Sequence, residues 1–186
     1  MVYAGIILAI LILLVGSFVY LYNRLVTLKN RVDNAWSQIE VQLKRRHDLI
    51  PNLVETVQGY VEHERETLEK VTKARQQAVD VDPDNLEQLA ESENFLTDTL
   101  RSLFAVTEDY PDLKANENFL ELQEELTSTE DRISFARQHY NDSVMSYNET
   151  QEHIPYNLIV SCGNFGKRDY FEIEDPTEKE TPEVEF

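Results

Sequence analysis

The chain has 186 residues, with 17 Lys and Arg against 35 Asp and Glu, and its formal net charge is -18. The hydrophobic content of 41% is too high for a wholly disordered protein, and a single Cys excludes a disulfide scaffold or a cysteine-rich zinc module. The acidic balance also excludes general nucleic-acid binding, because affinity for phosphates depends on Lys and Arg. With only five Gly and six Pro, the composition favours a helical protein over a turn-rich β-sandwich.

The first 23 residues contain no charged side chain, and residues 2–22 form a run of mostly aliphatic residues with Tyr at both ends. About 21 residues at ~1.5 Å rise match the ~30 Å hydrocarbon core of a bilayer. A cleaved signal peptide is one alternative, but no Lys or Arg precedes the run and Gly16-Ser17 is a poor cleavage site. A buried core helix is the other, although so small a protein has little to cover a helix that is apolar on every face. We predict an uncleaved anchor at residues 1–23, with membrane-facing residues Val2, Tyr3, Ile6, Leu14, Tyr20 and Tyr22.

Basic side chains follow the predicted span but do not precede it. Arg24, Lys29 and Arg31 come directly after the apolar run. Because the cytoplasmic flank of a span carries an excess of Lys and Arg, this pattern predicts a single-pass protein of the cell membrane with its N-terminus outside and the rest of the chain in the cytoplasm.

From Leu25 onward, apolar residues recur at intervals of three and four, which is the spacing of amphipathic helices. The stripes predict helices over residues 24–47, 49–79, 83–109 and 117–152. The expected fold is therefore all-α, with the N-terminal transmembrane helix continuing into an antiparallel up-and-down four-helix bundle at residues 24–153. The expected bundle core consists of Leu28, Val32, Trp36, Ile39, Leu43, Leu53, Val57, Leu96, Leu100, Leu126, Ile133 and Tyr140.

Capping residues and prolines mark the predicted helix starts. Asp48, with Pro51 in the first turn, marks the start of the second helix, and one continuous helix kinked at Pro51 is the alternative. Asp82 followed by Pro83 marks the start of the third helix. Thr129 falls on the apolar stripe of the fourth helix, so we expect its hydroxyl to bond back to its own helix or across to another one.

Two long blocks of the sequence resemble the signature blocks of the LemA family. They are RVDNAWSQIEVQLKRRHDLIPNLVETVQGYVEHE at residues 31–64 and YPDLKANENFLELQEELTSTEDRISFARQHYN at residues 110–141. Shorter matches are IPYNLI at residues 154–159, YFE at residues 170–172 and the closing VEF. The resemblance implies a membrane-anchored four-helix bundle of prokaryotes, with no established enzymatic activity and no catalytic set of residues to carry over.

Patterns typical of catalysis or metal binding are absent from the sequence. None of the four His residues has a Glu three positions before it, so the Glu-x-x-His motif of di-iron bundles is missing. His63, between two Glu residues, is expected to be a solvated helix-surface residue. Cys162 has no second thiol and no basic residue close before Lys167, which favours a small buried residue over a nucleophile. We therefore expect no enzymatic activity, no cofactor and no bound metal.

Residues 154–186 form an apolar segment followed by a mostly irregular acidic tail. The segment either lies at the membrane surface, to which the long fourth helix returns, or folds back onto the end of the bundle. Its apolar residues are Ile154, Tyr156, Leu158, Ile159 and Phe165. Residues 169–186 carry eight acidic residues and one Lys. Because acid is also spread over the helices, adaptation to a high-salt cytoplasm, as in a halophilic archaeon, is favoured over recruitment of a basic partner.

These features favour a membrane-anchored, non-enzymatic interaction or scaffolding module. Its expected partners are the lipid bilayer, through the N-terminal helix, and a protein partner or a second copy of the chain, with no nucleic acid. Two alternatives stay open: a homo-oligomeric membrane-shaping or coat protein, and a membrane-tethered enzyme or ligand carrier with a site in the bundle. A deep polar pocket with converging His and carboxylates would favour the enzyme or carrier.

Overall fold

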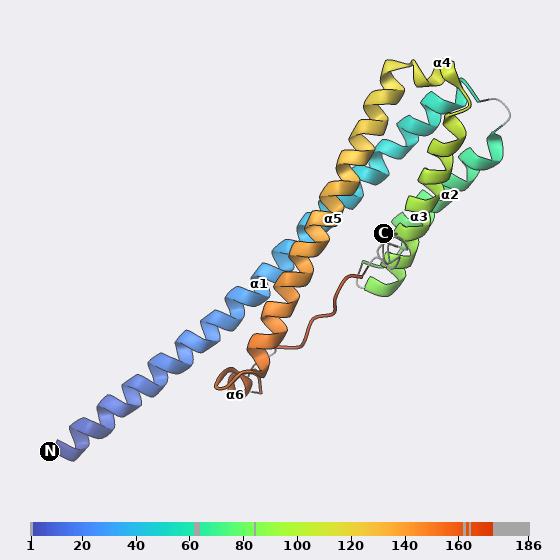
Figure 1. The fold of residues 1–186 in the computed structure, drawn as a ribbon. Helices are drawn as coiled ribbons and strands as arrows, with labels where there is room; N and C mark the ends of the chain where they lie inside the picture. The colour runs from blue at the N-terminus through green and yellow to red at the C-terminus, as the bar shows by residue number, and fades with distance from the viewer. Residues whose placement is uncertain (1, 62–63, 84, 162, 164, 173–186) are drawn as a thin grey trace, which may run out of the picture. The chain divides into compact units, whose positions relative to one another are not determined.

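A computed structural model describes residues 2–61, 64–83, 85–161, 163 and 165–172. Its helices are α1 (Val2–Gln58), α2 (Arg65–Asp80), α3 (Leu86–Thr107), α4 (Pro111–Lys114), α5 (Glu117–Glu152) and α6 (Tyr156–Val160) (Figure 1). The described residues contain no strand, so the prediction of an all-helical protein with a long apolar N-terminal helix is confirmed. His63, Cys162 and the predicted acidic tail from residue 173 onward lie outside the described residues.

The chain divides into two compact units. Unit 1 consists of Met1–Gln38 and Gln138–Tyr170, and unit 2 consists of Ile39–Arg137 and Phe171–Phe186. These boundaries differ from the predicted ones after residues 23 and 153, because α1 and α5 each contribute to both units.

Helix α1 continues through Pro51, so the predicted helix end at residue 47 and the new start at residue 49 are wrong, and Asp48 lies inside α1. Proline has no N–H, so Pro51 cannot donate to the carbonyl of His47, four residues earlier. That carbonyl instead accepts a hydrogen bond of 2.7 Å from Arg75 Nε. A donor from another helix thus satisfies the backbone at the position where the sequence predicts a break, and the open alternative of one continuous helix describes α1.

The remaining helix boundaries follow local capping. Only the second half of the predicted helix 49–79 forms α2. Helix α3 begins at Leu86 because Asn85 Oδ1 accepts from the backbone N–H of Gln88 at 3.2 Å, so Asn85 is the N-cap and the predicted start at Pro83 is wrong. Residues 111–114, expected in a break, form the short α4. Helix α5 has the predicted bounds, and Asn116 Oδ1 accepts from the N–H of Phe119 at 3.0 Å in its first turn.

The core of unit 2 draws apolar side chains from the helices α1 to α5, and α2 and α3 lie side by side (Figure 1). Its buried members are Ile50, Leu53, Val57, Val61, Leu68, Val71, Ala74, Ala78, Leu96, Leu100, Leu103, Leu113, Phe119 and Leu126. At about 25 cal/mol per Å² of apolar surface removed from water, this burial is the main favourable term in folding the unit. The core therefore fixes how these helices pack, and any polar side chain that enters it needs a partner.

Unit 1 contains the apolar start of α1 and the last part of α5. Helix α1 has one stretch that is long and apolar enough to cross a membrane, and none of that stretch is buried. Farther along α1, the buried face passes through Ala35, which is 1% exposed, so Trp36, expected in the core, is only half-buried. The Trp36 ring still contacts Tyr140 of α5, with ring centroids 5.3 Å apart.

Candidate functional site

Two opposite charges occupy positions on the apolar faces of α1 and α3. Arg46 continues the stripe that includes Leu43 and Ile50, and its side chain is 2% exposed. Glu93 lies between Leu89 and Leu96 on α3, and its side chain is fully buried. Helical spacing therefore sends both charges into the core of unit 2, where an unpaired charge would be very costly.

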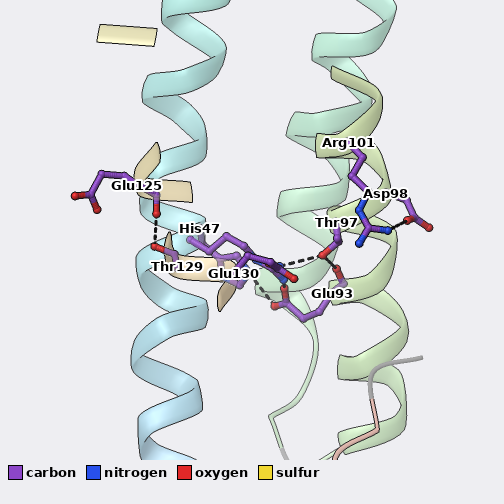
Figure 2. Close-up of polar contacts among 9 residues, drawn as sticks. His47, Glu93, Thr97, Asp98, Arg101, Glu125, Thr129 and Glu130 are labelled. Carbon is purple, nitrogen blue, oxygen red and sulfur yellow. Dashed lines mark hydrogen bonds and ion pairs between the residues drawn. The ribbon is translucent and has the colours of Figure 1, made fainter. Parts of the chain in front are cut away.

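Three further side chains contact this buried pair, and we call the five residues together the Arg46 network: Arg46, His47, Glu93, Thr97 and Glu130. Arg46 Nη2 donates to Glu93 Oε2. Its other terminal nitrogen, Nη1, donates to Thr97 Oγ1 at 3.0 Å and to Glu130 Oε2 at 2.5 Å. His47 Nε2 lies 2.9 Å from Glu93 Oε1. Figure 2 shows the labelled members converging from three helices, so the network joins α1, α3 and α5.

The network keeps Glu93 ionised in spite of its burial. Burial by itself raises the pKa of Glu93, but the hydrogen bond from His47 and the positive charge of Arg46 outweigh it and hold that pKa below the ordinary value of 4.5. An ionised carboxylate only accepts hydrogen bonds, so His47 Nε2 must carry the proton that it shares with Glu93. Each oxygen of the Glu93 carboxylate therefore accepts a hydrogen bond, Oε2 from Arg46 and Oε1 from His47.

The backbone beside the network is tied to α2 as well. The His47 carbonyl that Pro51 leaves without a donor accepts from Arg75 Nε, and Arg75 belongs to α2. The residue whose ring contacts Glu93 on α3 thus has its carbonyl held by α2. The helices α1, α2, α3 and α5 all meet at this level of unit 2.

Thr129 lies in the core of the same unit but has a local role. Its side chain is 1% exposed, and its hydroxyl donates to the carbonyl of Glu125 at 2.7 Å, one turn earlier on α5 (Figure 2). Of the two bonds predicted for this hydroxyl, the structure has the one within its own helix. The Glu125 side chain meanwhile accepts from Arg45 Nη2 on the surface, where both side chains are nearly half exposed.

The hydrogen bonds of Arg46 run from α1 to α3 and α5. The guanidinium of Arg46 contacts both carboxylates and so occupies the place that a bound cation would take. No group of three or more His, Cys, Asp or Glu able to hold a metal ion occurs among the residues that the structure describes. His47, which could act as a base, is committed to Glu93. A histidine and two carboxylates therefore converge at this level of unit 2, where they contact one another and Arg46.

The sequence contains a signal for the network that catalytic and metal-binding motifs do not include. On two apolar stripes, a charged residue occupies a position where the helical spacing predicts an apolar one: Arg46 on α1 and Glu93 on α3. Opposite charges at core positions of two helices predict a buried ion pair, although the spacing along the chain does not say which helices are neighbours. The Glu-x-x-His motif does not identify His47, because that motif takes its Glu from the same helix and the partner of His47 is Glu93 on α3.

The residues singled out in the sequence lie as follows. The predicted membrane-facing residues are exposed: Val2, Tyr3, Ile6, Leu14, Tyr20 and Tyr22. Of the predicted core residues, those other than Trp36 are buried. The predicted interfacial segment is divided, because Ile159 and Phe165 are buried, Tyr156 is half-buried, and Ile154 and Leu158 are exposed.

Comparison with known proteins gives one family. The model of the LemA family matches residues 35–186 of this chain. Protein LemA of Metamycoplasma hominis is 32% identical over 143 residues, which cover 74% of this chain and 64% of that protein. Magnetosome protein MamQ 2 of Paramagnetospirillum magneticum is 23% identical over 182 residues, which cover 85% of this chain and 67% of that protein. The chain thus spans about two thirds of the length of these relatives.

Proposed function

Because the chain belongs to the LemA family, we propose that it is a membrane-anchored interaction module that works by holding a partner at the bilayer and has no enzymatic activity. The partner is a protein, either another chain or a second copy of this one. The magnetosome proteins among its relatives are named for a cell compartment rather than for a reaction, which accords with a binding role.

One observation carries the proposal: α1 has two parts of opposite character in one helix. Its first stretch is apolar on every side and unburied, which is the character of a membrane span. Its later part places Ile50, Leu53 and Val57 in the core of unit 2. Both parts belong to one helix, so α1 itself joins the apolar stretch to the chain of unit 2.

The orientation follows from the charges next to the span. Arg24, Lys29 and Arg31 follow it, so the positive-inside rule favours an external N-terminus and a cytoplasmic unit 2. We propose that α1, α2, α3 and α5 form an antiparallel four-helix bundle there, with short connections. The Arg46 network supports this, because it joins three of these helices and Arg75 joins the fourth.

Photo-crosslinking from an exposed aromatic position tests the proposal in native membranes. Phe135 on α5 is 71% exposed, and a benzophenone amino acid at this position reports on whatever covers α5. We expect the full-length protein to stay in the membrane after carbonate washing and to give a crosslinked product of discrete mass. The matched control is the same variant, purified and diluted in detergent, which should lose the product if the partner is another protein.

Each outcome bears on the proposal in a definite way. A product of twice the chain mass that survives purification identifies a second copy as the partner, and a product lost on purification identifies another protein. A protein that is removed by carbonate washing contradicts the membrane anchor. Absence of any product from Phe135 and from Phe95, which is 51% exposed on α3, contradicts an interaction module.

A further inference from the structure

The apolar residues that follow α5 fall into two groups with different surroundings. Ile159 and Phe165 are 4% and 8% exposed, so they pack inside unit 1. Ile154 and Leu158, on either side of the start of α6, are 83% and 67% exposed. Two branched aliphatic side chains within one turn of chain are thus open to water at the start of α6.

The buried group attaches this segment to the end of the apolar stretch of α1. The ring of Phe165 contacts the ring of Tyr22 edge to face, with centroids 5.4 Å apart. Tyr22 is the last residue of the uncharged apolar run, and its ring stacks on Phe18. Within unit 1, Phe165 therefore lies at the level where the predicted span leaves the hydrocarbon core.

The Phe165 ring lies so close to the backbone of Gly163 that a side chain there would collide with it. A Cβ at residue 163 would lie 2.6 Å from Cε2 of Phe165, which is closer than real Cβ contacts allow. Gly163 also donates its N–H to the carbonyl of Ile159 at 3.0 Å, so the turn after α6 is fixed to the helix itself. The absence of a side chain at residue 163 thus lets the ring reach Tyr22.

The chain after Phe165 is held on α5 by polar contacts. Asn148 pairs with the backbone of Arg168 in both directions, donating to its carbonyl at 2.8 Å and accepting from its N–H at 3.0 Å. The hydroxyl of Tyr140 donates to the carbonyl of Asp169 at 2.9 Å. Lys167 Nζ lies 2.6 Å from Glu152 Oε1, so the acidic side chain at the end of α5 is paired with a cation. The segment is therefore fixed on both sides of the turn that exposes Ile154 and Leu158.

We propose that α6 and the turn before it form a second membrane contact, in which Ile154 and Leu158 insert into the interface of the bilayer beside the end of the span. The inference rests on the proposed membrane anchoring of α1. The occupant of this surface is lipid, because the buried contact of Phe165 with Tyr22 holds the chain that follows α6 beside the end of the predicted span, within one unit. Arg24, two residues after Tyr22, offers a positive charge to anionic headgroups at the same level.

The contact would give the anchor a defined orientation. A single span can rotate about its axis and tilt in the bilayer. A second apolar contact beside its end restricts both motions, because it must face the lipid at the same time. The effective concentration of α6 at the interface is high, since the span already holds it there, so two side chains suffice where they could not bind a membrane alone.

Quenching by brominated lipids tests the contact in the full-length chain. Leu158→Cys in a Cys162→Ser background is labelled with an environment-sensitive fluorophore and reconstituted in vesicles of phosphatidylcholine and phosphatidylglycerol with brominated acyl chains. A label at Leu11→Cys reports insertion of the span, and a label at Asp142→Cys, exposed on α5 in unit 1, is the aqueous control. We expect quenching at Leu158 to approach that at Leu11, with none at Asp142.

A further variant tests the second membrane contact separately from the anchor. Gly163→Ala should displace the Phe165 ring from Tyr22, so quenching at Leu158 should fall while quenching at Leu11 is unchanged. If the label at Leu11 is quenched and the label at Leu158 is not, the second membrane contact is overturned and the anchor stands. This holds whether the label at Leu158 is in water or covered by a second copy of the chain. An unquenched label at Leu11 overturns both the anchor and the second membrane contact.

Discussion

Arg75 Nε donates a hydrogen bond of 2.7 Å to the carbonyl of His47, the backbone acceptor that Pro51 leaves without a donor inside α1. The cost of a proline inside a helix is about 3 kcal/mol, and part of it comes from the hydrogen bond that the proline cannot make. Here a side chain from α2 makes that bond instead. The proline thereby creates an acceptor that joins α1 to α2.

A double-mutant cycle should detect this relationship. Arg75→Met keeps much of the aliphatic stem but removes the donor, and we expect it to lower the free energy of unfolding by about 1–2 kcal/mol. In a Pro51→Ala background the helix regains its own N–H, so the same Arg75→Met change should cost much less. Denaturant unfolding of the full-length protein in detergent, followed by circular dichroism, measures all four variants. Equal costs of Arg75→Met in the two backgrounds would show that the bond does not compensate for Pro51.

The Arg46 network should be far more sensitive to mutation than an ion pair on the surface nearby. Glu93→Gln leaves Arg46 buried with only the half-exposed Glu130 as a counter-charge, and we expect a loss of about 3 kcal/mol in the free energy of unfolding. The matched control is Glu125→Gln, which removes the partner of Arg45 where both side chains are nearly half exposed, and it should cost at most about 1 kcal/mol.

Removal of both buried charges tests the origin of that cost. Arg46→Met combined with Glu93→Leu leaves no unpaired charge in the core, so the double variant should be more stable than Glu93→Gln alone. A double variant that is no more stable than the single one would mean that packing around these positions, rather than charge burial, determines the loss.

Acid should weaken unit 2 through Glu93. The folded pKa of this carboxyl is lower than its ordinary value of 4.5, so its contribution to stability is fully present above that value and is lost as the pH falls through the folded pKa. The free energy of unfolding of the wild-type chain should therefore fall below about pH 4.5 more steeply than that of Glu93→Gln. Parallel curves for the two proteins between pH 6 and pH 3 would contradict a depressed pKa at Glu93.

Predictions from the sequence are correct where local interactions define a helix and wrong where a residue remote in sequence decides the outcome. Helix α5 has the predicted bounds because an uninterrupted stripe and local signals at both ends define it. The break at Asp48 was predicted wrongly because the compensating donor, Arg75, is remote in sequence, and local rules for Pro51 cannot include it. The predicted start of α3 is wrong for a more local reason, since the helix is capped by Asn85, three residues after Asp82.

The Arg46 network was partly predictable. A charge on an apolar stripe, as at Arg46 and Glu93, indicates burial that needs a partner. Helical periodicity does not provide the pairing, because that depends on which helices are neighbours and on their vertical register. The interfacial segment has the same character: its composition predicts an apolar surface, but only packing separates buried Phe165 from exposed Leu158.

The net charge of -18 predicts that salt stabilises the protein, because charges of one sign repel each other across the folded surface and added ions screen that repulsion. We expect the thermal midpoint of the full-length protein in a non-ionic detergent to rise between low salt and molar NaCl. The matched control is a chain truncated after Glu172, which removes six acidic residues and one Lys. If the acid spread over the helices is responsible, the truncated chain should show most of the same rise. A rise confined to the full-length chain would place the repulsion in the tail, and a flat response in both would remove salt adaptation as the reason for the acidic composition and favour a basic partner.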